Sequence, residues 1–427
     1  MPAGTRRVTD ASHVSTLIVA AAWIAVAAYA VFWIPRHLPG RARDFDFAVY
    51  YTEALALAHH DNPYTVDLKP IAASFGFDIT PVVHATDPPP FLVMIEPMAA
   101  TGPARAFWIW TAANVAMLAL SLLLLFGIDA AGPRSAALLA AVAIAYPPVR
   151  ALFFFGQSKM SILLTLAAAM RALERRRDAS AGLLLAFASL TRIFPLLMAI
   201  FLILRRRWRA LGFMIAGIAA GLTLTVAVLG LTPTLDWSAG VRILSLRIFQ
   251  DAGENVALPA FVSRVLLAAP GGGSGALVEA AEILASIAIF ILTCVPTMRA
   301  RPDDREAGLR LFALWVTASV ILSPMAPIYD LVLLLIPLSV IARDAIVDRV
   351  VAAPAILAIA SVGLMFLVCG SGCLNSVGWI VSYILVRRIG LPIGGLIAEG
   401  ATLSLFLAYA AAFCLALEPA MKPEPPL

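Results

Sequence analysis

One apolar stretch carries arginines at both ends and in its middle: RRRDASAGLLLAFASLTRIFPLLMAIFLILRRRWR, residues 175–209. Basic residues mark the cytoplasmic ends of membrane spans, so a single straight span would leave one arginine tract outside. Pro195 can break a helix, and two half-helices folded into a hairpin would keep both tracts inside. The hairpin would place Arg192 deep in the membrane, facing protein or water and not lipid. We therefore expect a broken or re-entrant segment over residues 179–203.

The composition indicates a polytopic helical membrane protein. The chain has 427 residues, of which 61% are hydrophobic and 13% charged, with a mean hydropathy of +0.92. A soluble domain is about half apolar and a quarter charged. Helices satisfy their own backbone hydrogen bonds where water is absent. The expected fold class is all-α: a single integral membrane domain over residues 1–427, a transmembrane bundle of about 11–13 helices.

The arginine tracts orient the predicted spans. Arg6 and Arg7, which precede an apolar run from about Val14 to Pro35, are expected to be cytoplasmic. The same holds for the basic tracts within residues 171–177, 205–209, 299–305 and 342–349. Residues 36–90 then form a first outer (periplasmic or extracellular) loop and residues 232–256 a second. We expect a multi-pass protein of the cell membrane, inner or plasma. Basic residues spread in short tracts indicate topology and no nucleic-acid binding.

The first outer loop contains a dense polar sequence, DFDFAVYYTEALALAHHDNPY, residues 44–64. With helical spacing from residue 46 onward, Asp46, Tyr50 and Glu53 fall on one face of an amphipathic helix. The adjacent apolar face can pack on the membrane domain or lie in the membrane interface. An aspartate at its start can cap the helix, or it can act as a general base toward a hydroxyl acceptor. The two functions can also be divided between Asp44 and Asp46.

Six short motifs occur in the order and spacing of one known family. They are DFAVYY to DNPY (46–64), PPPFLVMIEPMA (88–99), FWIWTAANV (107–115), GQSKMSILL (156–164), AGLLLAFASLTRIFPLL (181–197) and SPMAPIYDLVLLLIPL (323–338). Together they resemble glycosyltransferase family 87, integral membrane enzymes of the GT-C class. The resemblance covers most of residues 14–345.

The resemblance implies an inverting hexosyl transfer, often of mannose, from a polyprenyl-phosphate carrier to a lipid or glycan acceptor at the outer face. The family's base is an aspartate early in the first outer loop. Asp46 matches it, with Asp44 as the alternative. No nucleotide cofactor is implied, and a divalent cation near the lipid phosphate is compatible with the motifs. The mycobacterial members tend to carry Trp and His where this chain has Pro327, Tyr329 and Asp330. That departure weakens the case for their phosphatidylinositol mannoside acceptor.

Further polar residues complete the expected substrate site. The candidates for binding substrate are Tyr50, Glu53, Tyr64, Gln157, Arg192, Arg264, Tyr329 and Asp330. Arg192, Lys159 and Arg264 are the candidates for holding the donor phosphate. Arg264 can equally be an outer membrane anchor, and for Lys159 the anchor is the favoured interpretation. Gln157 can hold sugar hydroxyls or cap a helix. Asp330 can hold the acceptor, pair with an arginine or cap a helix.

No metal site is predicted, because His59 and His60 have no further ligands at a useful spacing. Cys369 and Cys373 fit either a disulfide or two thiols at helix ends. The expected partners are the donor, the acceptor and membrane lipids. A transporter or flippase of lipid-linked saccharides is the main alternative, although transporters concentrate functional charges near the bilayer midplane. A non-catalytic scaffold is a second alternative, and it gives no reason for a buried Arg192.

Overall fold

The computed structural model describes seven stretches of the chain: residues 46–79, 82–126, 141–244, 255–267, 275–346, 352–369 and 393–417. Within them the secondary structure is helical, apart from an isolated bridge between Asn255 and Pro327. The predicted all-α class is confirmed. The first predicted span, Asp44 and Cys373 lie outside the described residues.

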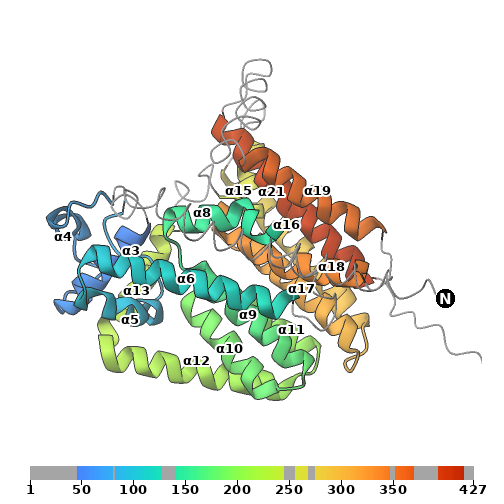
Figure 1. The fold of residues 1–427 in the computed structure, drawn as a ribbon, viewed down its shortest axis with the longest axis horizontal. Helices are drawn as coiled ribbons and strands as arrows, with labels where there is room; N and C mark the ends of the chain where they lie inside the picture. Colours follow the sequence, from blue (N-terminus) through green and yellow to red (C-terminus); the bar gives the residue numbers. More distant parts are fainter. Residues whose placement is uncertain are drawn as a thin grey trace, which may run out of the picture.

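Figure 1 shows the described helices. In chain order they are α3 (Asp46–Ala58), α4 (Leu68–Ser74), α5 (Pro89–Ile95), η3 (Glu96–Ala100), α6 (Pro103–Phe126), α8 (Pro147–Phe155), α9 (Lys159–Glu174), α10 (Asp178–Thr191), η4 (Phe194–Leu197), α11 (Met198–Leu204), α12 (Trp208–Leu229), α13 (Leu231–Leu244), α15 (Leu258–Leu267), α16 (Gly275–Arg299), α17 (Arg305–Ile321), η5 (Ile328–Leu334), α18 (Leu335–Ile346), α19 (Ala352–Cys369) and α21 (Ile393–Leu417).

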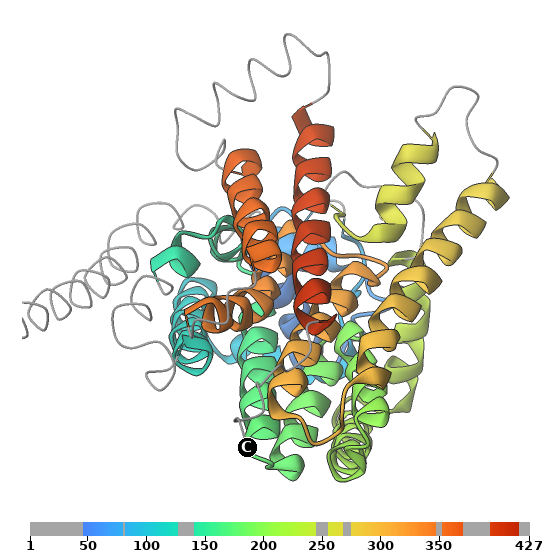
Figure 2. The ribbon, with the colours of Figure 1, turned by 90° about the vertical axis from the view of Figure 1, so that its right-hand side faces the viewer.

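Four of the described helices are long and apolar enough to cross a membrane: α6, α12, α16 and the Gly400–Leu417 part of α21. Only 11% of the apolar windows of α12 and α16 is buried within the protein, so these two helices present most of their apolar surface to lipid. α19 and α21 pack side by side (Figure 2). The chain is a multi-pass membrane protein.

The predicted hairpin over residues 179–203 is present. α10 ends at Thr191, Arg192 is extended with φ −152° and ψ 147°, and the chain returns through η4 and α11. The two ends meet again, because Arg207 Nη1 lies 3.5 Å from Asp178 Oδ1. Both arginine tracts therefore lie on the same side, and the break at Arg192 lies at the opposite end of the two half-helices.

The basic tracts that were expected to be cytoplasmic lie together. The carboxylate of Glu174 contacts Arg171 at 2.8 Å, Arg305 at 3.0 Å and Arg343 at 3.2 Å. Arg205 donates to the backbone oxygens of Ala300, Pro302 and Asp304. We call this end of the bundle the arginine face. Four tracts far apart in sequence thus share one side, as the positive-inside rule predicts.

The two predicted outer loops also meet, away from the arginine face. Asn62 Nδ2 donates to Asp236 Oδ2 at 2.8 Å, and the Trp237 indole donates to the Thr86 oxygen at 3.2 Å. The second loop begins with helix α13, which lies near α5 (Figure 1). These contacts close the end of the bundle that contains α3.

Helix α3 is buried on both faces, so of the two positions expected for its apolar face it takes the one packed on protein. Tyr50 and Glu53 are buried on one face, and Phe47, Tyr51 and Ala54 on the other. α4, α5, η3 and α6 all pack around it, and the Tyr51 hydroxyl donates to the Thr101 oxygen at 2.7 Å. The first outer loop folds back over its own helix, so the apolar face contacts protein and not the membrane surface.

The hairpin depends on the close approach of α10 and α12. A Cβ on Gly182 would lie 2.2 Å from the Ala210 oxygen and 2.8 Å from the Met214 nitrogen, so backbone would have to move. We expect Gly182→Ala to lower the free energy of unfolding by about 1–3 kcal/mol. The measurement is thermal unfolding of the purified protein in detergent.

Gly212→Ala on α12 is the matched control, because a Cβ there meets nothing within 4 Å. It should leave the melting temperature unchanged or raise it slightly, since alanine favours a helix over glycine. Equal destabilisation by both variants would contradict the close approach.

Candidate functional site

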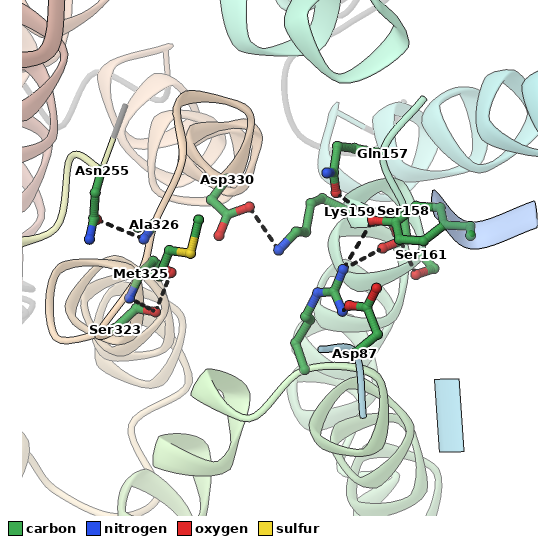
Figure 3. A network of polar contacts seen from close by, with 12 residues as sticks. Asp87, Gln157, Ser158, Lys159, Ser161, Asn255, Ser323, Met325, Ala326 and Asp330 are labelled. Atoms are coloured by element: carbon green, nitrogen blue, oxygen red, sulfur yellow. Dashed lines mark hydrogen bonds and ion pairs between the residues drawn. The ribbon is translucent and has the colours of Figure 1, made fainter. Parts of the chain in front are cut away.

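A buried cluster of polar side chains lies at the far end of α9 from the arginine face. α9 begins at Lys159 in this cluster and ends at Glu174 in the arginine face; its 16 residues span about 24 Å. Figure 3 shows the central side chains: Asp87, Gln157, Ser158, Lys159 and Asp330. They come from the first loop, the turn between α8 and α9, and η5.

A glycine turn joins this cluster to α3. Gly156 ends α8 in the left-handed conformation, at φ +70°, and a Cβ there would lie 2.7 Å from Phe47 Cβ. The Trp110 indole donates to the Gly156 oxygen at 2.8 Å. The turn therefore packs directly against α3. As a result the Tyr50 hydroxyl donates to Gln157 Oε1 at 2.8 Å.

Arg192 has partners on several sides of its guanidinium group. It forms an ion pair with Asp87, and Nη2 lies 3.1 Å from the Tyr50 hydroxyl and 3.3 Å from Ser158 Oγ. Its Cζ also lies 5.1 Å from the centre of the Phe91 ring, which adds a cation–π contact. The arginine in the middle of the hairpin faces protein, as the sequence predicted.

Lys159 forms the second buried ion pair of the cluster. Its Nζ lies 2.9 Å from Asp330 Oδ1, with side chains 7% and 2% exposed. The rings of Phe194 and Tyr329 flank the ammonium group at 5.9 and 5.8 Å. The expectation of an outer membrane anchor is therefore wrong. Asp330 pairs with this lysine rather than with an arginine. A lone lysine in an apolar segment, directly after the Gly-Gln-Ser turn, was the signal in the sequence.

Asp46 begins α3 beside this cluster. It is half-buried, and α3 lies outside the candidate membrane spans. Burial raises the pKa of its carboxyl to about 6, while a hydrogen bond with the Gln157 side chain acts in the opposite direction. Most molecules carry an ionised Asp46 at pH 7, and this carboxylate is a stronger base than an exposed one. The geometry suits a proton acceptor.

Glu53 lies one turn beyond Tyr50 on the same helix face. The side chain is completely buried and forms no ion pair within the described chain. A backbone hydrogen bond at Thr86 favours the ionised form but is outweighed by burial. Burial, and next the negative charge of Asp87, raise the pKa of Glu53 well above its usual range. Burial therefore favours the neutral carboxylic acid form of Glu53, because a buried carboxylate without a cation beside it is costly.

The other predicted residues lie around this centre. The Tyr64 hydroxyl donates to the Asp87 backbone oxygen at 2.8 Å, which holds the loop that carries the Arg192 partner. Tyr329 flanks Lys159, as described. Arg264 Nη1 donates to the Asn255 oxygen at 2.8 Å. Asn255 in turn accepts from the Ala326 amide, so Arg264 supports the segment that leads into η5.

The part of the chain that the structure describes contains no group of three or more His, Cys, Asp or Glu side chains that could hold a metal ion. Positive charge at the cluster is supplied by Arg192 and Lys159, each with a carboxylate beside it. Fold and site together define a multi-pass membrane protein with a buried acid–base and cation cluster at one end of its bundle.

Comparison with known proteins gives the family. Residues 85–324, more than half of the chain, match the model of glycosyltransferase family 87. The chain belongs to this family and is a membrane glycosyltransferase. Membership in a family of transferases decides against the transporter, flippase and scaffold alternatives. None of the curated proteins matches the chain.

Two solved structures are similar to this one. Both are ArnT from Cupriavidus metallidurans, one bound to undecaprenyl phosphate and one in the apo state. Each is 14% identical with a TM-score of 0.38. The alignments cover 94% and 95% of this chain and 77% and 78% of those chains.

A neutral Glu53 has a measurable effect on stability. Above the ordinary glutamate pKa of 4.5, folding requires Glu53 to take up a proton, because the carboxyl ionises only in the unfolded chain. Glu53→Gln keeps the shape and never ionises. We expect its melting temperature to equal that of the wild type at pH 4 and to exceed it increasingly up to pH 8. The free-energy difference should grow by up to about 1.4 kcal/mol per pH unit.

Thermal unfolding in detergent across this pH range measures the difference. Asp61→Asn, an exposed carboxyl in the same loop, should show no such trend. A gain for Glu53→Gln that is the same at every pH would contradict a neutral Glu53.

Proposed function

We propose that the chain transfers a hexose, with mannose as the first candidate, from a polyprenyl-phosphate donor to a lipid or glycan acceptor at the outer face of the membrane. Asp46 is the general base and the transfer inverts the anomeric centre. The observation that carries this proposal is the presence of a carboxyl with a raised pKa beside two buried cations. Family membership and the motif resemblance support the donor class.

The chemistry needs two groups on opposite sides of the sugar. Asp46 accepts the proton of the acceptor hydroxyl as its oxygen bonds to the anomeric carbon. The bond from that carbon to the phosphate oxygen breaks, and polyprenyl phosphate leaves with the electron pair. A fixed cation at the leaving phosphate stabilises the developing charge. Arg192 and Lys159 supply that charge, so the proposal needs no nucleotide or metal cofactor.

The two cations are not equally available to a phosphate. Arg192 is held by Asp87, Tyr50 and Ser158 and stacks on an aromatic ring. The ion-pair partner of Lys159 is Asp330 alone within the described chain. We therefore assign direct phosphate binding to Lys159. The phosphate of the donor takes the place of the Asp330 carboxylate beside the lysine. Arg192 adds long-range positive charge and holds the first loop in place.

The position of the cluster supports the outer face. The arginine face marks the cytoplasmic side by the positive-inside rule. The cluster lies about 24 Å away along α9, close to the thickness of the hydrocarbon core. A donor whose lipid chain lies in the membrane and whose sugar lies at the outer surface would place its phosphate at the level of the cluster. The inner or plasma membrane of a cell is the proposed location.

Direct transfer tests the reaction and its base. Purified protein is incubated with radiolabelled polyprenyl-phosphate mannose and extracted membrane lipids, with and without EDTA. We expect transfer by the wild type, insensitive to EDTA, and a fall of about 10²- to 10⁴-fold in Asp46→Asn, because the base is lost. Asp61→Asn controls for an unrelated change in the same loop. Thermal unfolding of each variant shows that the fold is intact.

Equal transfer by wild type and Asp46→Asn would move the base to another carboxyl, with Asp44 the next to be tested. If the wild type transfers no mannose, the same assay with polyprenyl-phosphate glucose and galactose separates a different sugar from a wrong donor class. Failure with every polyprenyl-phosphate hexose would overturn the proposed donor.

Binding of polyprenyl phosphate tests the division between the two cations. We expect Lys159→Gln to weaken binding by about tenfold or more, because a charge-assisted contact to phosphate is lost. Asp330→Asn should strengthen binding, since the phosphate no longer displaces a carboxylate. Titration by intrinsic fluorescence in detergent measures both. If Asp330→Asn weakens binding as much as Lys159→Gln, the carboxylate supports the site and does not occupy the place of the phosphate.

A further inference from the structure

A cavity opens in the arginine face, at the opposite end of α9 from the candidate active site. Its empty space, with the open mouth included, is about 540 Å³. The deep wall is apolar and formed by Met170, Leu173, Phe201, Leu309 and Phe312, all buried. The mouth carries charged side chains from the turn after α9 (175–177) and the turn after α11 (205–207), the two arginine turns, and from the start of α17. The cavity is therefore amphipathic: apolar inside and charged at the membrane surface.

The cationic charge at the mouth exceeds what the nearby acids neutralise. Four arginines line the cavity, Arg176, Arg205, Arg207 and Arg305, against the three acids Glu174, Asp303 and Asp304, so one positive charge remains. Glu174 is also shared with Arg171 and Arg343, which lie outside the cavity. Arg207 has only a long contact of 3.5 Å to Asp178. Arg176 is exposed and has no ion pair within the described chain. Asp303 and Asp304 also line the cavity, and the Asp304 carboxylate caps α17 by accepting from the Ala307 amide.

The two arginine turns share one backbone geometry. Arg176 and Arg206 both adopt the left-handed conformation, at φ 56° and φ 54°. In each turn the following amide reaches back to the helix: Arg177 N to the Ala172 oxygen, and Arg207 N to the Leu202 oxygen, both at 2.8 Å. Glycine is the usual residue at that position. His60 after α3 adopts the same conformation, at φ 61°, so it is a way of ending a helix in this protein. At the ends of α9 and α11 it places arginines at corresponding positions beside the cavity.

Arg205 and Gly308 give the cavity its shape. The Arg205 guanidinium is fixed by three backbone oxygens of the loop before α17, as described above, and it forms part of the wall. Gly308 lies on α17 opposite it, and a Cβ there would meet only Arg205 Nη2, at 3.7 Å. The missing side chain leaves space between the cationic mouth and the apolar wall.

We propose that this cavity binds the phosphate headgroup of an anionic phospholipid from the inner leaflet. The arginines at the mouth contact the phosphate, because guanidinium groups match phosphate oxygens with paired hydrogen bonds. The apolar wall contacts the first carbons of the acyl chains. A soluble phosphate would leave this apolar part of the cavity unfilled. Basic pockets between helices at the cytoplasmic surface suit such headgroups. The bound lipid would hold α9, α11 and α17 together at the base of the hairpin.

Stability in lipid bilayers of known composition tests the site. Protein is reconstituted in nanodiscs of phosphatidylcholine alone or with phosphatidylglycerol added, and thermal unfolding is recorded. A ligand that binds only the folded protein raises the melting temperature. We expect a phosphatidylglycerol-dependent rise in the wild type. It should be at least halved in the double variant Arg176→Gln with Arg207→Gln, and in Gly308→Leu, which fills the cavity and keeps every charge.

Arg175→Gln is the matched control, because Arg175 is exposed in the same turn and does not line the cavity. It should keep the full rise. An equal rise in all variants would mean a general effect of surface charge and would overturn the site. If the double variant does not fold, Gly308→Leu decides alone. Glycerol phosphate added to phosphatidylcholine nanodiscs separates the sources. An equal rise with this soluble anion would overturn the lipid assignment.

Discussion

The ion pair between Arg192 and Asp87 is the contact on which the outer end of the molecule depends. A guanidinium group within an apolar bundle is stable only when it is paired and hydrogen-bonded. The pair joins the break of the hairpin to the first outer loop, 105 residues earlier in the chain. Tyr50 and Ser158 complete the partners of Arg192. One buried charge thus fixes α3, the turn before α9 and the hairpin relative to each other.

The two ends of the bundle handle positive charge differently. At the outer end, each cation has a carboxylate partner; the Lys159 pair is buried and the Arg192 pair is largely buried. At the arginine face, the cations outnumber the acids and many are exposed. Buried paired cations are suited to exchange one anion for another. Exposed unpaired cations are suited to a charged membrane surface. The hairpin produces this asymmetry, because it returns both of its arginine tracts to one side.

The sequence alone predicts the local features of this structure well. Arginine tracts on both sides of Pro195 predict the hairpin, and spacings of three and four predict the shared face of Asp46, Tyr50 and Glu53. The pairings between distant segments could not be predicted. Nothing in the local pattern indicates that Lys159 reaches Asp330, 171 positions later. The burial of α3 on both faces also depends on later helices that cover it. Helical periodicity within α3 carries no information about those distant segments.

The charge balance of the outer cluster restricts how an anionic donor can enter. With Glu53 in its neutral form, Arg192 and Lys159 face the three carboxyls of Asp46, Asp87 and Asp330. The three carboxyls outnumber the two cations, so the phosphate of a donor would be repelled unless one carboxylate moves away or takes up a proton. Asp330 contacts a lysine, whose single ammonium group can change partners without breaking a paired geometry. Asp87 is paired with the Arg192 guanidinium, which also contacts Tyr50 and Ser158. In the proposed mechanism, the carboxylate that gives way to the donor is therefore Asp330, and a neutral form of Glu53 keeps the remaining negative charge low enough for the exchange.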